Sequence, residues 1–173
     1  ELNGVNLTLT GTDPFLNTFY VTAAQINAQQ SLTINAPNGS VVLVNINGNN
    51  IEWKGGLHVY GTTKENVLFN FYRARNITIR NIDVTGSVLA PKATVDFTSG
   101  VQNGQMMAKS VTGQGQFNLA PFIGNVPIDP YLPNTAEIIA LDQIDNNVNN
   151  DASQIVVQIQ VIPNPNGGGG NGG

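Results

Sequence analysis

Hydrophobic and polar residues alternate along much of the chain with a period of two. Within residues 76–80, for example, Ile77 and Ile79 alternate with three polar residues. A strand with one buried face points successive side chains to opposite sides, so this pattern predicts a half-buried β-strand. Only 10% of the residues are charged, and the many Asn, Thr, Gln, Ser and Gly residues favour strands and turns over helices.

Apolar phrases of the same form recur along the sequence. Residues 43–46 read LVNI, and residues 68–71, 25 positions later, read LFNF. Residues 86–90 and 104–108, 18 positions apart, share a Gly, two large apolar residues and an Ala in the same order. A period in this range is typical of stacked coils, in which each repeat forms one turn. The sequence therefore predicts an all-β fold, a β-solenoid with coils of about 18–25 residues.

Polar residues within these phrases predict contacts and turns. Asn45 and Asn70 occupy matching positions, and stacked Asn side chains on neighbouring coils can form a hydrogen-bonded ladder. A local turn that satisfies each amide separately is the alternative. The Asn-Gly pairs at 38–39, 47–48 and 103–104 predict turns with a positive φ.

Composition divides the chain into four segments. Residues 1–132 carry the strand-like phrases and are predicted to form the β-solenoid domain. An acidic, Asn-rich connector at 133–151, a strand arm at 152–162 and a Gly- and Asn-rich tail at 163–173 follow. A short helix at 135–146 is compatible with an apolar stripe in the connector.

The basic residues are concentrated in the middle of the chain. All seven Lys and Arg residues lie between Lys54 and Lys109 with three acidic residues, whereas the flanks carry eight acidic residues and no base. This segregation favours contacts between acidic ends and a basic middle, within one molecule or between copies. A basic strip with Arg73, Arg75 and Arg80 could contact nucleic acid, but the net charge of -4 argues against that partner.

Three phrases resemble the choice-of-anchor A family of bacterial surface proteins: GSVLAPKATVDF at 86–97, NGQMMAKSVTGQG at 103–115 and PFIGNVP at 121–127. The resemblance extends over residues 3–127 and covers the C-terminal half of the family's domain. It implies a secreted cell-surface protein, in a family that includes collagen-binding adhesins and has no settled catalytic motif. The phrases are also similar, more distantly, to coils of ice-binding β-solenoids. Ice binding is not expected here, because stacked Thr-x-Thr rows are absent beyond Thr8 and Thr10.

Few residues suit catalysis. His58 is the single histidine, cysteine is absent, and neither a nucleophile elbow nor a zinc-hydrolase motif occurs. We therefore expect no enzymatic activity and no cofactor. The remaining enzymatic alternative is a polysaccharide-acting solenoid with Arg80, Asp83, Lys92 and Asp96 along one groove.

Two candidate binding sites are compatible with the sequence. Trp53, His58 and Tyr60 form the densest aromatic patch, which suits a sugar ring or a peptide, and a packed corner is the alternative. Carboxylates in the stretch DQIDNNVNND could bind calcium, although their spacing differs from an EF-hand loop and favours a solvated linker. The candidate metal ligands are Asp142, Asp145 and Asp151.

Both ends of the chain contain an apolar, strand-like face that could contact another subunit. The residues of these faces are Val5, Leu7 and Leu9 near the start and Ile155, Val157, Ile159 and Val161 near the end. Each face could cover the chain's own core or add a strand to a neighbouring copy, because the edge of a sheet exposes unpaired backbone groups.

These features favour a non-enzymatic extracellular structural protein that self-associates into a fibre or layer by strand addition. One alternative is a monomeric cell-surface adhesin domain that binds collagen or an extracellular glycan; another is the polysaccharide-acting enzyme. We expect no nucleic-acid partner. We also expect no membrane insertion, because nowhere do eighteen apolar residues run together.

Overall fold

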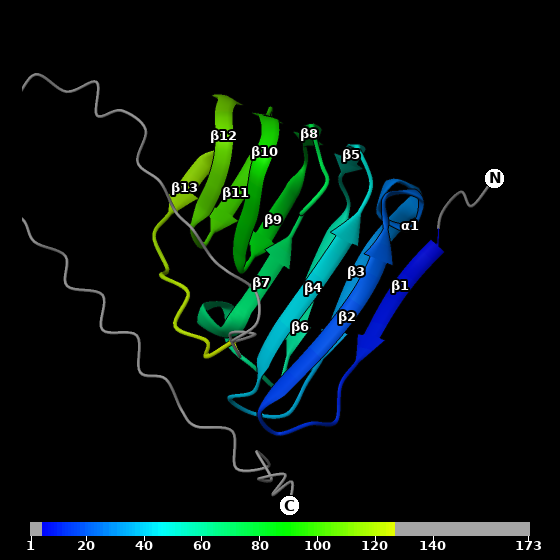
Figure 1. Cartoon of the computed structure of the whole chain (residues 1–173), viewed down its shortest axis with the longest axis vertical. Helices are drawn as coiled ribbons and strands as arrows, with labels where there is room; N and C mark the ends of the chain where they lie inside the picture. Colours follow the sequence, from blue (N-terminus) through cyan, green and yellow to red (C-terminus); the bar gives the residue numbers. More distant parts are fainter. Residues whose placement is uncertain (1–4, 127–173) are drawn as a thin grey trace, which may run out of the picture. The chain divides into compact units, whose positions relative to one another are not determined.

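The computed structural model describes residues 5–126 (Figure 1). Strands make up most of this part of the chain, which confirms the all-β class. None of its helices is long and apolar enough to cross a lipid bilayer. The elements are β1 (Val5–Thr10), β2 (Leu16–Thr22), α1 (Ala23–Ala28), β3 (Gln29–Asn35), β4 (Val41–Asn47), β5 (Asn50–Trp53), β6 (Gly56–Tyr60), the 3-10 helix η1 (Lys64–Asn66), β7 (Val67–Asn70), β8 (Asn76–Ile79), β9 (Ile82–Thr85), β10 (Ser87–Phe97), β11 (Gly100–Asn103), β12 (Met106–Gly113) and β13 (Gln116–Asn118).

The strands form three parallel sheets. One sheet has the order β1-β3-β6, and another has the order β13-β11-β9. The largest has the order β2-β4-β7-β10-β8-β5, with β12 also paired to β10, and it is curled (Figure 1). Strands that follow each other in the chain are not paired. Neighbours within a sheet come from successive passes of the backbone, and we call each such pass a turn of the chain.

The register of these pairings confirms both sequence repeats. Leu43, Val44 and Asn45 of β4 pair with the residues 25 positions later in β7. Val88, Leu89 and Ala90 of β10 pair with the residues 18 positions later in β12. A sequence repeat thus corresponds to one turn of the chain, and equivalent residues lie on top of one another.

Strand β10 joins the two halves of the curled sheet. Its first part, Ser87–Leu89, pairs with β7, and its last part, Thr94–Phe97, pairs with β8. Between these parts the register of β10 with β12 shifts, between Ala90 and Thr94, where Pro91 and Lys92 are exposed. Proline cannot donate a ladder hydrogen bond, which suits it to this bend.

Alternate side chains of the strands fill a core between the sheets. Val42, Val44 and Ile46 of β4 are fully buried, whereas the intervening side chains face outward. Trp53 lies in the same core, with its ring centroid 4.8 Å from that of Phe69 and 5.5 Å from that of Phe71. The period-two pattern therefore marks the buried face, as the sequence predicts.

Helix α1 was not predicted. Its N-cap Thr22 forms a capping box with Gln25, in which Thr22 Oγ1 accepts from the Gln25 N–H and Gln25 Oε1 accepts from the Thr22 N–H. The helix then covers the edge of β5, because Asn27 Oδ1 accepts from the Glu52 N–H at 2.8 Å. A helical turn with one buried residue, Ile26, thus protects an edge that would otherwise lack a partner.

Residues after β13 return along the stack of turns. The Phe122 N–H donates to Gln105 Oε1, and the Ile123 N–H donates to the Glu65 carbonyl oxygen. Gly124 lies close to the side chain of Val41, which belongs to an earlier turn. This segment, 119–126, therefore joins at least three turns. The predictions for the connector, the 135–146 helix, the strand arm and the tail lie outside the described residues.

Candidate functional site

The outer face of the β1-β3-β6 sheet presents side chains in rows that run across the strands. Thr8, Thr33 and His58 occupy one row, because each pairs in register with the next. Tyr60 lies two positions beyond His58 on β6 and therefore faces the same side. The two rings stack with centroids 6.4 Å apart and an interplanar angle of 18°.

A hollow lined by His58, but not by Tyr60, lies where two sheets meet without a ladder. The β1-β3-β6 sheet ends at β6, and the β13-β11-β9 sheet ends at β9. The hollow has a volume of about 430 Å³. Its lining comes from β6, β9, the turns before them and the first residue of β11: Gly55, Gly56, Leu57, His58, Asn81, Ile82, Asp83 and Gly100.

This hollow between β6 and β9 is our candidate binding site. The turns of the chain shorten here. The sequence separation between Asp83 and its partner Val101 is smaller than that between Thr33 and its partner His58. Turns of different length follow different paths, so β6 and β9 do not come into register. Their facing edges leave backbone donors and acceptors available beside the hollow.

Glycine shapes the floor of the site. A Cβ on Gly56 would lie 3.1 Å from His58 Nε2, so the imidazole occupies the space above a residue without a side chain. Tyr60, the next residue on the same face of β6, stacks its ring against the imidazole. The local sequence GGLHVY thus positions His58 through a missing side chain and an aromatic contact.

The polar groups of the hollow suit a neutral, hydroxyl-rich ligand. His58 and Asp83 are both exposed, on different strands that line the hollow, and Asn81 lines it with them. Tyr60 is 57% exposed and offers an apolar ring with a hydroxyl at its tip. Hydrogen-bonding groups around an aromatic plane are the usual means of holding a sugar ring or a small polar ligand.

Trp53 does not belong to this site; for this residue the predicted alternative of a packed corner holds, not the ligand-binding patch. It is fully buried, whereas His58 and Tyr60 face outward. Trp53 is an inward residue of β5, like Ile51 two positions before it. The structure therefore brings His58 and Tyr60 together and leaves the indole in the core.

The predicted subunit-contact residues are only partly described. Leu7 and Leu9 are half-buried and pack against the core from β1, so their side chains cover the chain's own interior. Strand β1 has β3 as its partner on one side and forms the edge of its sheet. Val5 begins this strand. The other predicted residues of this set and the candidate metal ligands lie outside the described residues.

The four residues of the enzymatic alternative are not brought into one groove. Arg80 donates from Nε to Glu52 Oε1 at 2.9 Å, and Lys54 Nζ lies 3.4 Å from Glu52 Oε2. Asp83 lies on β9, Asp96 lies on β10 in a different sheet, and Lys92 is at the bend of β10. The hydrogen bond from Arg80 lowers the pKa of Glu52, more than desolvation raises it. Within residues 5–126 no three His, Cys, Asp or Glu side chains form a metal-binding group.

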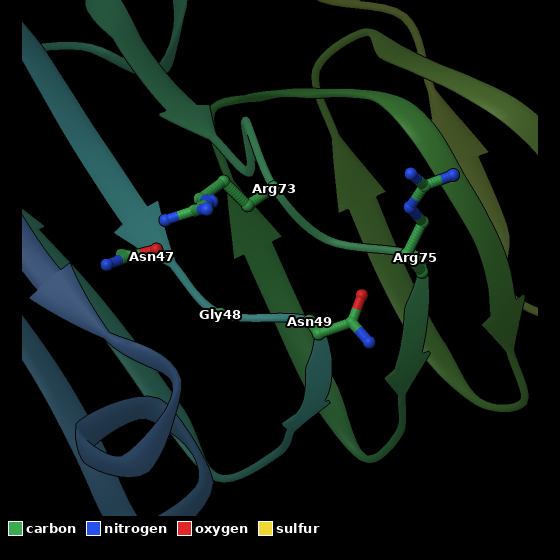
Figure 2. Close-up of a pocket in the computed structure, with 5 residues that line it drawn as sticks. All are labelled: Asn47, Gly48, Asn49, Arg73 and Arg75. Atoms are coloured by element: carbon green, nitrogen blue, oxygen red, sulfur yellow. The ribbon is translucent and has the colours of Figure 1, made fainter.

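A second hollow, of about 410 Å³, lies at the corner between β4 and β8 and was not predicted. Arg73 and Arg75, from the turn after β7, line it with Asn47, Gly48 and Asn49; Figure 2 shows the Arg73 side chain extending toward Asn47 and the Arg75 side chain pointing away from it. The backbone fixes this arrangement, because the Arg75 N–H donates to the Asn49 carbonyl oxygen at 2.9 Å. The basic strip of the sequence is thereby divided: Arg73 and Arg75 share this corner, whereas Arg80 pairs with Glu52.

Comparison with known proteins identifies a family. The family described as "Putative Ice-binding-like adhesive domain" matches residues 1–119, and the chain belongs to it. No curated protein matches, and no solved structure matches. Membership in this family suggests an adhesin-like, non-enzymatic role at an extracellular or surface location.

Proposed function

We propose that this chain is an extracellular adhesin domain that binds a glycan in the hollow between β6 and β9. The observation that carries the proposal is the stacked pair of His58 and Tyr60, exposed beside a polar hollow. Packing of the core does not explain this aromatic pair, since neither ring is buried. It is suited to a ligand that presents a flat, partly apolar face and hydroxyl groups.

The parallel stack supports a β-solenoid architecture for this domain. Each turn adds one strand to a sheet, and both sequence repeats follow the turns. Such a scaffold holds exterior side chains at regular intervals of about 4.8 Å, the spacing of neighbouring strands. We further propose the choice-of-anchor A family as the more specific relationship, on the phrases that the paired strands β10 and β12 contain.

Binding measurements with matched tyrosine variants test this function. Immobilised glycans and collagen peptides are probed with the wild-type chain, with Tyr60→Ala and with Tyr20→Ala. Tyr20 is 79% exposed on a different sheet, so its removal controls for the loss of any surface tyrosine. We expect Tyr60→Ala to weaken glycan binding about tenfold, equivalent to about 1.4 kcal/mol. Tyr20→Ala should bind like the wild type.

Other results would contradict the proposal. Equal effects of the two tyrosine variants would show that the ligand does not use this hollow. Binding to collagen in place of any glycan would favour the collagen-binding adhesin. A control variant, Thr18→Ala, removes another exposed side chain of β2 and should change nothing.

Self-association is a second candidate function, and the exposed sheet edges favour it. β1 and β13 each lie at the edge of a sheet, with one partner strand among the described residues. An unpaired edge can accept a strand from another copy, such as the predicted arm at 152–162. Sedimentation of the full chain over a range of concentrations tests this function. A single monomeric species at every concentration would rule it out.

A further inference from the structure

Four exposed basic side chains lie along the corner where the curled sheet bends between its two halves. Arg73 and Arg75 belong to the turn between β7 and β8, and Lys92 belongs to the bend within β10. Lys109 lies in β12 and is also exposed. We call these four residues the basic corner.

Strand pairing on both sides of the corner aligns these residues. On one side Asn70 pairs with Leu89, which pairs with Met107. On the other side Asn76 pairs with Thr94, which pairs with Ser110. The basic residues lie between these two sets of partners, so they follow one another on three successive turns. With about 4.8 Å between neighbouring strands, the charges extend over a line of about 10 Å.

The basic corner has no ionic partner within residues 5–126. The ion pairs of this part of the chain are those of Glu52 with Lys54 and with Arg80. Asp96, the acidic residue of β10, pairs in register with Thr78 and Thr112 and lies two positions beyond Thr94, away from the corner. A line of unpaired like charges raises the local potential and attracts anions.

The neighbouring groups indicate the kind of anion. The amides of Asn47 and Asn49 line the same hollow as the two arginines, as Figure 2 shows, and amides exchange hydrogen bonds with hydroxyl groups. A guanidinium group binds carboxylate or sulfate oxygens through two parallel hydrogen bonds. Tyr72, 38% exposed in the same turn, adds one aromatic ring. Single-stranded nucleic acids are usually held by several aromatic rings on which successive bases stack.

We infer that the basic corner binds a linear polysaccharide that carries carboxylate or sulfate groups. Its anionic groups contact the successive basic side chains, and its hydroxyl groups contact the two asparagines. This site is separate from the hollow between β6 and β9 and does not depend on glycan binding there. The shared chemistry of the ligand is a chain of sugars with regularly spaced anions.

Charge-matched variants of the full chain test this inference. The probes are polygalacturonate, which carries carboxylates, heparin, which carries sulfates as well, uncharged dextran and a DNA duplex. The variant Arg73→Gln/Lys92→Gln removes two charges from the corner, and the control Lys54→Gln/Lys64→Gln removes two charges elsewhere. Retained Trp fluorescence and circular dichroism verify that each variant is folded.

We expect at least one acidic polysaccharide to bind at low salt, and added salt to weaken the binding. The corner variant should lose about tenfold in affinity, whereas the control should lose less than about twofold. The corner variant should bind dextran, which carries no anionic groups, as the wild type does. Tyr60→Ala should leave this affinity unchanged, which distinguishes this site from the proposed glycan hollow.

Three results would overturn the inference. Equal losses in the two charge variants would mean that only net charge matters. Tighter binding of the DNA duplex than of either acidic polysaccharide, at the same salt concentration, would identify a nucleic-acid site. Absence of binding to both acidic polysaccharides at low salt would leave the basic corner without the proposed ligand class.

Discussion

Asn70 Nδ2 donates a hydrogen bond to Asn45 Oδ1 across 2.8 Å, between two turns of the chain. The two residues are also partners in the β4–β7 ladder, so their backbones and side chains are aligned together. This contact confirms the predicted asparagine ladder over the alternative of two local turns. It links a polar side chain to the stacking of turns, because the two amides meet only when the turns are in register.

A double-mutant cycle should detect this contact. We expect Asn45→Ala and Asn70→Ala to show a coupling of about 0.5–1 kcal/mol in the free energy of unfolding, because the hydrogen bond is half-buried. Asn50 and Asn76 form a similar bond of 2.9 Å in an exposed position and provide the control cycle. Coupling should be smaller there. Equal stabilities for all four Asn45/Asn70 combinations would show that the ladder contributes nothing.

The buried position of Trp53 gives a spectroscopic prediction. As the single tryptophan, it should emit at short wavelength and resist quenching by iodide in the folded chain. Trp53→Ala should lower the free energy of unfolding by about 3–5 kcal/mol, because it leaves a cavity beside Phe69 and Phe71. Trp53→Phe should cost less. Ready quenching of the folded protein would place the indole at the surface instead.

Gly39 and Gly61 differ in why glycine is needed: both have a strained backbone conformation, but only Gly61 also lies close to a neighbouring turn. Gly39 and Gly61 both have a positive φ, of 74° and 84°. A Cβ on Gly39 would meet nothing within 4 Å, whereas one on Gly61 would overlap the Ala36 carbonyl oxygen of the preceding turn. We expect Gly39→Ala to cost about 1 kcal/mol and Gly61→Ala at least about 2 kcal/mol more. Chemical denaturation measures both, and equal losses would contradict this interpretation of the turn.

The Glu52 ion pair should make stability depend on pH. The hydrogen bond from Arg80 lowers the pKa of Glu52 below its ordinary value of 4.5. A carboxyl whose pKa is lowered by folding stabilises the fold above its unfolded pKa, and this contribution is lost as the pH falls through the folded pKa. The advantage of the wild type over Glu52→Gln should therefore be present near neutral pH and disappear in acid.

Arg80→Gln provides the control for this pH dependence. In that background, Glu52→Gln should have a smaller effect, because the main cause of the lowered pKa is gone. Thermal unfolding at several pH values measures the difference. A wild-type advantage that does not change with pH would assign it to packing rather than to charge.

The predicted strand arm can be tested by two charged substitutions. Ile155, Val157, Ile159 and Val161 would each contribute about 1.5–3 kcal/mol if fully buried against another copy. Val157→Asp with Ile159→Asp should therefore abolish self-association, because unpaired charge would be placed in an apolar contact. The circular dichroism of the parallel stack should remain. Unfolding of the variant would show that the arm completes its own domain.

The sequence was informative wherever one turn of the chain repeats another. The phrases around Leu43 and Val88 predicted which residues pair, because stacked turns place residues at equivalent positions in similar surroundings. The Asn-Gly pairs were less informative. Gly39 has the positive φ expected of a turn, but Gly48 and Gly104 do not, and Gly104 is instead close to the Gly86 carbonyl oxygen.

The candidate sites were harder to predict from the sequence because they depend on how the strands are oriented. Alternation with Ile51 could have placed Trp53 inside, whereas grouping residues by type placed it with His58 and Tyr60. The hollow beside β6 results from a change in turn length; the two repeat spacings show this change, but they do not show that it leaves a hollow. The basic corner requires the register across the bend of β10, where Lys92 and Lys109 come from different turns.

The progressive shortening of the turns makes the two ends of the described stack unlike each other. Asn6 pairs with Ser31 across a long turn at one end, whereas Val101 pairs with Gln116 across a much shorter turn at the other. A second copy placed end to end would have to match a wide turn to a narrow one, and much of its backbone would find no partner. A single strand added at one edge avoids this mismatch. We therefore expect the unequal turn lengths to disfavour end-to-end stacking of residues 5–126 on a second copy.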